Sequence, residues 1–272
     1  MAAACNLTFC VVGRDARQLA AARALQNSGY TVLGAEGAGQ ADYILLPMPM
    51  DAEAADLARI LRAARPGTLA LGGRISEPVR KAAQAGVELV DYFLRPELAC
   101  LNAVPTAEGC LALLMQLRQR TIWESEFLVL GYGRIGRAVA RRLQALGGQV
   151  TIAARAPEQR AAARCAGLHA APLTALEQLL PHFDAVINTI PAPVLGAAQL
   201  RCLPRGALIL DLASRPGGTD FAAARELGLR AEHALSLPAR CAPETAGALV
   251  AHTVEVILQE RAATARSERG VS

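Results

Sequence analysis

Three glycines near the middle of the chain have the spacing of a pyrophosphate-binding turn. The apolar run 127–130 leads directly into the segment Gly131-Tyr132-Gly133-Arg134-Ile135-Gly136, which has the pattern GxGxxG. Gly131 would allow a tight turn, Gly133 the approach of a phosphate to the backbone, and Gly136 the close packing of the next helix. The N–H groups at the start of that helix would face the phosphates. The segment therefore predicts a dinucleotide site.

The end of the following strand indicates which dinucleotide binds. The helix after the motif stops at Gly147-Gly148, and a second strand follows over 149–154. NAD enzymes usually place an acidic residue about 20 positions beyond the motif to hold the ribose 2′-hydroxyl. This chain has Arg155 there, and a guanidinium group suits the 2′-phosphate of NADP. The order of strand, turn, helix and strand predicts a Rossmann fold, with NADP favoured over NAD.

Composition excludes several other classes of protein. The 272 residues are 53% hydrophobic, enough for the cores of one large or two ordinary domains. The apolar runs are broken short of the roughly 18 residues of a membrane span, and no signal peptide is visible. The seven scattered cysteines predict no metal site or disulfide framework and fit a reducing cytoplasm. The charge of +4 comes from dispersed arginines, so we expect no nucleic-acid-binding face.

The rest of the chain alternates apolar runs of strand length with helical stretches. Residues 7–91 carry about five such runs, which predicts a flavodoxin-like, doubly wound parallel sheet with helices on both faces. Its first turn, residues 13–17, lacks the second and third glycines of the dinucleotide motif. We therefore expect this domain to hold something other than the cofactor pyrophosphate.

Two similar helix openings indicate how the domains are connected. Residues 104–109 and 242–247 each have a proline near the first turn and a Thr-Ala pair with a glycine close behind. We infer that one helix carries the chain into the Rossmann domain and the other carries it back. This predicts a substrate domain of residues 1–103 plus 245–272 and an inserted Rossmann domain of residues 104–244. The two helices should pack against each other at the cleft, and residues after about Ala262 should fray.

Ligands in open α/β sheets lie beyond the carboxyl ends of the strands. Two polar loops follow apolar strands in the second domain, at 188–191 and 211–218. With the glycine motif and the strand tip, they predict this cofactor-binding set: Gly131, Tyr132, Gly133, Arg134, Ile135, Gly136, Arg155, Thr189, Pro191, Ala213 and Ser214.

Several segments of the chain together resemble the dipicolinate synthase A family of bacteria. They include GRDAR at 13–17, DYFLRPELACLNAVPTAEG at 91–109, DLASRPGGTDF at 211–221 and APETAG at 242–247. The resemblance covers nearly the whole chain, from about Val11 to about Leu258. One departure is Ala239-Arg240, where the family usually has glycine and lysine, so that the charge is kept and the glycine is lost.

The resemblance implies an NADP-linked oxidation that makes dipicolinate, which is pyridine-2,6-dicarboxylate. The substrate would be a dihydrodipicolinate formed from 4-hydroxy-tetrahydrodipicolinate. The implied partner is the flavoprotein-like dipicolinate synthase B, and the implied location is the cytoplasm of the mother cell of a sporulating bacterium. The oligomeric state of the chain stays open.

A dicarboxylate substrate requires cationic groups, because arginine binds a carboxylate in a fork. The candidate arginines are Arg17, Arg95 and Arg240. Loss of a ring proton requires a base, and the unranked candidates are Asp15, Glu97 and Glu108. The connection over 92–108 is dense in polar groups, so we also expect these residues to contact the substrate: Tyr92, Asn102 and Thr106.

Other functions stay open. D-2-hydroxyacid dehydrogenases and adenosylhomocysteinases share an inserted Rossmann domain. None of the four histidines stands in a visible relay with arginine and glutamate, which argues against the first of these enzymes. The chain could also be a non-catalytic NADP-binding module that supports dipicolinate synthase B. Cofactor turnover by the chain alone and with its partner would separate these functions.

Overall fold

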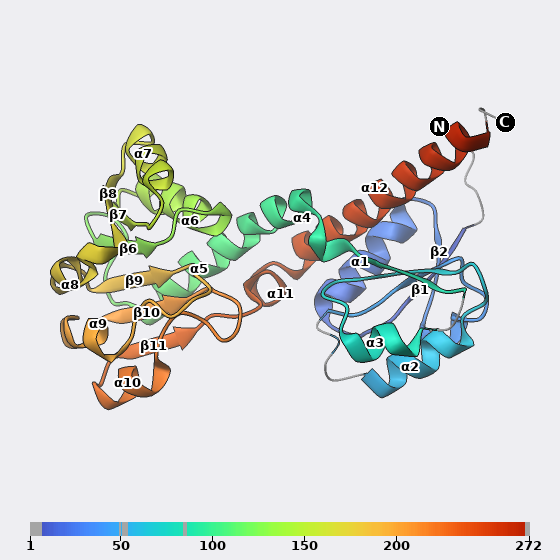
Figure 1. Ribbon diagram of the computed structural model, residues 1–272, viewed down its shortest axis with the longest axis horizontal. Coiled ribbons are helices and arrows are strands. Elements are labelled where there is room, and N and C mark those ends of the chain that lie inside the picture. Colours follow the sequence, from blue (N-terminus) through green and yellow to red (C-terminus); the bar gives the residue numbers. More distant parts are fainter. Residues whose placement is uncertain (1–6, 49, 51–53, 84–85, 270–272) are drawn as a thin grey trace. The chain divides into compact units, whose positions relative to one another are not determined.

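The chain folds into two compact units, shown as a computed structural model in Figure 1. The structure describes residues 7–48, 50, 54–83 and 86–269. Unit 1 consists of Met1–Asn102 with Ala242–Ser272, and unit 2 consists of Ala103–Cys241. The first boundary, after Asn102, lies one residue before the expected one, and the second, after Cys241, lies three residues before the expected one.

Unit 1 is built on a five-stranded parallel sheet with the strand order β2-β1-β3-β4-β5. Its strands are β1 (Thr8–Val11), β2 (Thr31–Leu33), β3 (Tyr43–Leu45), β4 (Leu69–Gly72) and β5 (Glu88–Asp91). This is the order of flavodoxin-like doubly wound sheets, so the predicted fold class of the first domain is confirmed.

Helices cover both faces of the sheet of unit 1. They are α1 (Ala16–Asn27), α2 (Ala54–Ala63), α3 (Glu77–Ala82), α4 (Pro96–Leu101) and α12 (Pro243–Arg269), with 3-10 turns η1 (Ala35–Gly37) and η2 (Tyr92–Leu94). Successive strand residues point to opposite faces. Phe9 therefore packs with Leu25 of α1 and Val254 of α12, whereas Cys10 packs on the other face with Leu57 of α2 and Val79 of α3.

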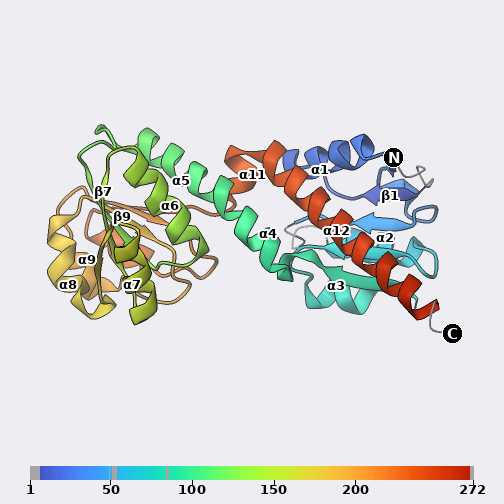
Figure 2. The same ribbon diagram turned by 90° about the horizontal axis from the view of Figure 1, so that it is seen from above.

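The last helix, α12, lies against α1 within unit 1 (Figure 2). It continues to Arg269, so the prediction that the chain frays after about Ala262 is wrong. Near its end, Arg261 forms an ion pair with Glu88 of β5, and the hydroxyl of Thr264 donates to the carbonyl of Glu260 within the helix over 3.1 Å. Polar composition alone gave no sign of these contacts.

Gly247 lets α12 approach α1 closely. A Cβ atom at this position would lie 2.4 Å from the carbonyl oxygen of Arg17 and 2.5 Å from the Cβ of Ala20. We expect Gly247→Ala to destabilise unit 1 by about 1–3 kcal/mol, because a backbone shift is needed to relieve the overlap. Urea unfolding that is monitored by the hydrogen exchange of the α1 amides measures this loss of stability. Gly196→Ala is the control, since its Cβ would meet only the flexible end of Gln199, and an equal loss of stability in both variants would contradict the prediction.

Unit 2 is built on a six-stranded parallel sheet with the order β11-β10-β9-β6-β7-β8. Its strands are β6 (Glu126–Leu130), β7 (Gln149–Ala153), β8 (His169–Ala171), β9 (Ala185–Asn188), β10 (Leu208–Asp211) and β11 (Arg230–His233). Counted within the unit, this is the Rossmann order 3-2-1-4-5-6 in reverse, so the predicted fold is confirmed. Strand β8, a three-residue edge strand of alanine and histidine, was not predicted from the sequence.

The helices of unit 2 pack on both faces of this sheet. They are α5 (Ala103–Leu117), α6 (Arg134–Ala145), α7 (Pro157–Cys165), α8 (Leu176–Leu179), α9 (Ala197–Arg201), α10 (Phe221–Glu226) and α11 (Leu237–Cys241), with 3-10 turns η3 (Leu173–Ala175) and η4 (Leu180–His182). Residues Ala239-Arg240, which depart from the family pattern, lie in α11.

One helical stretch is more apolar than the broken apolar runs of the sequence suggested. Pro96–Leu117 is long and apolar enough to cross a membrane by length and composition, with 56% of its window buried inside the protein. Cys110 and Leu114 of α5 are part of the core of unit 2. Packing in a protein core accounts for the apolar character of this part of the stretch.

Candidate dinucleotide site

Two of the three motif glycines, Gly131 and Gly136, occupy positions that require glycine, and the third, Gly133, leaves open space. Gly131 has a φ of +89°, and a Cβ there would lie 2.7 Å from the hydroxyl oxygen of Thr189. A Cβ on Gly136 would lie 2.2 Å from the carbonyl oxygen of Gly131, so α6 can start this close to β6 only with glycine. At Gly133, which caps α6, a Cβ would meet no atom within 4 Å. The space above Gly133 fits the approach of a pyrophosphate.

The loop after β9 is fixed to the glycine turn. The N–H and the hydroxyl of Thr189 both donate to the carbonyl of Leu130, over 3.0 and 2.8 Å. The side chain of Asn188 closes the same loop, since its Oδ1 accepts from the N–H of Ile190 over 3.0 Å. The predicted residues Thr189 and Pro191 therefore lie beside the glycine turn at the carboxyl edge of the sheet.

The loop after β10 is organised by a buried carboxylate. Asp211 has no exposed surface and accepts from Asn188 Nδ2 at 2.9 Å, from the N–H of Ala213 at 3.0 Å and from the N–H of Gly218 at 2.8 Å. His233 Nε2 lies 2.8 Å from the carbonyl oxygen of Ala213. These bonds hold the predicted residues Ala213 and Ser214 in a loop that is joined to the loop after β9.

Asn188 and Asp211 were not among the predicted site residues. A signal for them exists in the sequence, because each is a polar residue that ends a fully buried strand, and β9 and β10 are neighbours in the sheet. Their contact joins the two loops at the edge where ligands bind.

The remaining predicted cofactor residues lie around the same edge. Arg155 is exposed just beyond β7, and within the described ranges its side chain makes no hydrogen bond or ion pair. Arg134 is exposed in the first turn of α6. Tyr132 is buried, with the guanidinium of Arg137 5.3 Å from its ring centre, and Ile135 packs against the core.

Three of the predicted substrate residues gather in unit 1. Asp15 caps α1 by accepting from the N–H of Gln18 over 2.9 Å, and Arg17 Nη2 lies 3.4 Å from Asp15 Oδ2. The side chain of Arg17 is only 10% exposed. Burial raises the pKa of Tyr92, the positive charge of Arg17 opposes this shift, and Asp91 and Asp15 add to it. Arg17 and Asp15 thus contact each other after β1, and their charges act on Tyr92, which follows β5.

The other predicted residues are engaged elsewhere or stand apart. Arg95 forms an ion pair with Glu260 through both Nη atoms, and Glu97 is exposed in the first turn of α4. Glu108 accepts from Arg142 over 3.1 Å, and Arg240 Nη2 lies 3.5 Å from Glu232 Oε1. Asn102 ends α4 in unit 1, and Thr106 is buried in α5 of unit 2.

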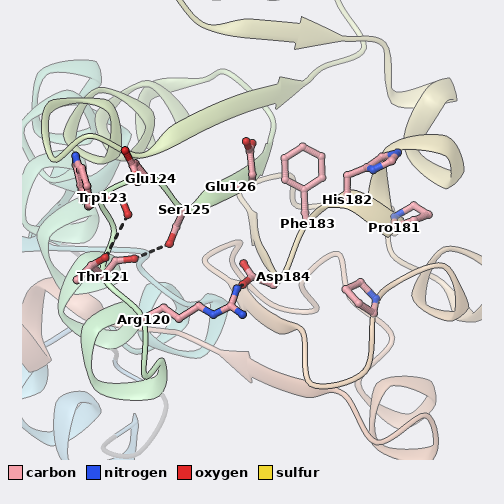
Figure 3. Close-up of a pocket in the computed structure, with 11 residues that line it drawn as sticks. Arg120, Thr121, Trp123, Glu124, Ser125, Glu126, Pro181, His182, Phe183 and Asp184 are labelled. Carbon is pink, nitrogen blue, oxygen red and sulfur yellow. Dashed lines mark hydrogen bonds and ion pairs between the residues drawn. The ribbon is translucent and has the colours of Figure 1, made fainter.

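A pocket of about 490 Å³ lies at the opposite edge of the sheet of unit 2 (Figure 3). Its lining includes Trp123, Glu126 at the start of β6, and Asp184, which directly precedes β9 and pairs with Arg120 at 3.0 Å. Ligands of parallel α/β sheets bind at the carboxyl edge, so this pocket is separate from the dinucleotide site. Across the residues that the structure describes, no group of three His, Cys, Asp or Glu side chains could hold a metal ion.

Fold and site together define a Rossmann-type dinucleotide-binding protein. The family model of the D-isomer specific 2-hydroxyacid dehydrogenase NAD binding domain matches residues 110–216. The solved structure of the dipicolinate synthase A chain from Bacillus subtilis is 31% identical in sequence to this chain. The match covers 96% of this chain and 98% of that chain, with a TM-score of 0.81. The chain belongs to the dipicolinate synthase A family, as the sequence motifs predicted.

Two further comparisons agree with this family. The crystal structure of dipicolinate synthase A from Bacillus halodurans is 29% identical in sequence. The match covers 93% of this chain and 97% of that chain, with a TM-score of 0.84. Dipicolinate synthase A of Bacillus subtilis (strain 168) is 41% identical over 179 residues, which are 66% of this chain and 60% of that relative. The match thus spans less than two thirds of this curated relative.

Proposed function

We propose that this chain oxidises a dihydrodipicolinate, formed from 4-hydroxy-tetrahydrodipicolinate, to pyridine-2,6-dicarboxylate with NADP as the hydride acceptor. It would act with the flavoprotein-like dipicolinate synthase B in the mother cell of a sporulating bacterium. The observation that carries the proposal is the 31% identity to a dipicolinate synthase A chain across 98% of that chain. The open backbone at Gly133 and the fixed loops after β9 and β10 support dinucleotide binding.

The residues of unit 2 would hold the dinucleotide. Gly133 and the first N–H groups of α6 would face the pyrophosphate, and Arg155 would pair with the 2′-phosphate. The loops that Asn188 and Asp211 fix would orient the nicotinamide ring. When bound, NADP supplies a ring carbon that accepts hydride, and the substrate ring releases a proton to a base of the protein.

In unit 1, Arg17 is the arginine that we propose for a substrate carboxylate. Its guanidinium is largely buried and, among the residues that the structure describes, makes one long hydrogen bond, to Asp15, so an incoming carboxylate would bind it in a weakly screened environment. Asp15, with 43% of its side chain exposed, is the proposed base. Glu108 and Arg95 are paired at shorter distances with residues outside the predicted substrate set, Arg142 and Glu260, whereas the partner of Asp15 is Arg17 itself.

Arg17→Ala should lower kcat/KM for the dicarboxylate by at least about tenfold and leave the Kd of the cofactor unchanged, because the cofactor-binding loops lie in unit 2. Steady-state assays in the presence of dipicolinate synthase B and a cofactor titration measure both quantities. Arg62→Ala, which removes an exposed arginine of α2, is the matched control. Equal kinetics in the two variants would remove Arg17 from the substrate site.

Reduction of NADP by the purified chain, alone and with dipicolinate synthase B, tests the function itself. Dihydrodipicolinate-dependent turnover that needs this chain is the expected result. Turnover by dipicolinate synthase B without this chain would favour the non-catalytic NADP-binding module. NAD-dependent oxidation of a D-2-hydroxy acid would favour the dehydrogenase alternative, and cleavage of adenosylhomocysteine would favour the other enzyme class.

A further inference from the structure

Arg160 connects α7 to the backbone that carries Arg155. Its Nη1 atom lies 2.9 Å from the carbonyl oxygen of Ala154 and 2.6 Å from that of Arg155, and it donates to both. These two carbonyls follow the last residue of β7, Ala153. One guanidinium group therefore fixes the peptide units on both sides of Arg155.

Much of the hydrogen-bonding capacity of Arg160 is still available. A guanidinium has five N–H donors in one plane, and Nη1 contributes two of them. In the part of the chain that the structure describes, Nε and Nη2 of Arg160 have no hydrogen-bond or ion-pair partner. Glu158, the acidic residue in the first turn of α7, forms no ion pair with Arg155 or Arg160 among the described residues. Arg160 therefore keeps its positive charge without a neutralising neighbour.

We propose that Arg160 is a second determinant of cofactor specificity, which positions Arg155 and adds its own free N–H groups to the binding of the 2′-phosphate. The inference rests on the proposed use of NADP. A phosphate monoester carries close to two negative charges at neutral pH and has three acceptor oxygens, so two guanidinium groups match it better than one.

The alternative is that Arg160 only stabilises the turn after β7. The two roles differ in which cofactor is affected. NAD and NADP share the adenosine, the pyrophosphate and the nicotinamide, so a distorted turn would weaken both. Loss of a phosphate-binding group would weaken NADP alone.

The experiment measures the Kd of NADP and of NAD by calorimetry for the wild type, Arg155→Ala, Arg160→Ala, Arg160→Lys, the double alanine variant and Arg164→Ala. Arg164 is an exposed arginine in the last turn of α7 and serves as the matched control. We expect Arg160→Ala to raise the Kd of NADP about tenfold, which is the loss of one charge-assisted contact, with the Kd of NAD within about twofold. The Kd of NADP for Arg160→Lys should lie between the values for the wild type and for Arg160→Ala. The double alanine variant should raise this Kd by less than the product of the two single fold-changes.

Two results would separate the inference from the function on which it rests. Wild-type protein that prefers NAD would reject NADP as the cofactor and the role of Arg160 with it. Wild-type protein that prefers NADP, with Arg160→Ala equal to Arg164→Ala or with both cofactors weakened equally, would reject the role of Arg160 alone. Melting temperatures of all variants identify any loss of folding. If Arg160→Ala does not fold, Arg160→Lys, which keeps a donor and the charge, replaces it. A larger rise in its Kd for NADP than in its Kd for NAD supports phosphate binding, and equal rises reject it.

Discussion

Asp211→Ala should lower the free energy of unfolding of unit 2 by about 3–5 kcal/mol. The carboxylate is fully buried and accepts hydrogen bonds from Asn188 Nδ2 and from the N–H groups of Ala213 and Gly218. Alanine would leave the N–H groups of Ala213 and Gly218 without an acceptor, at roughly 1–3 kcal/mol for each before relaxation, and Asn188 Nδ2 would keep only its bond to the carbonyl of Ile190. The loops after β9 and β10 would also separate, so we expect weaker binding of the cofactor.

The single tryptophan of the chain makes this measurement specific to one unit. Trp123 lies in unit 2, so a change in its fluorescence during urea unfolding reports on unit 2. Asp220→Ala is the matched control, because in the described part of the chain the side chain of Asp220 accepts one hydrogen bond, from the N–H of Ala223, and so caps α10. Loss of such a cap costs about 1 kcal/mol. If both variants unfold at the same urea concentration, Asp211 does not organise the two loops.

The features that the sequence predicted correctly depend on local patterns. The glycine motif requires one turn geometry, and alternating strands and helices require a parallel sheet. Both follow from residues that are close together in the chain. The missed strand β8 consists of one histidine and two alanines, so it lacks the β-branched and aromatic side chains that mark the equally short strands β2 and β3.

Side-chain partners were harder to predict, because they lie far apart in the sequence. Arg95 and its partner Glu260 are separated by 165 positions, and Asn188 and Asp211 by 23. The many arginines of this chain look alike in the sequence, whereas the structure separates Arg17, which is mostly buried, from Arg155, which is exposed just beyond β7. Burial and distance, which decide what an arginine can bind, appear only in the fold.

Arg155→Ala should weaken NADP by about 1.5–3 kcal/mol, which is roughly 10- to 150-fold in Kd, and should leave NAD nearly unchanged. The guanidinium is exposed at the tip of β7 without a hydrogen-bond partner for its side chain in the described ranges, so it is available to pair with the 2′-phosphate, which NAD lacks. Titration of both cofactors into the wild type and the variant measures the change, and Arg225→Ala, an exposed arginine of α10, is the control. The preference for NADP should also shrink below about pH 6, where a phosphate monoester loses its second negative charge. A wild type that prefers NAD, or a variant that loses both cofactors equally, would show that Arg155 does not select the cofactor.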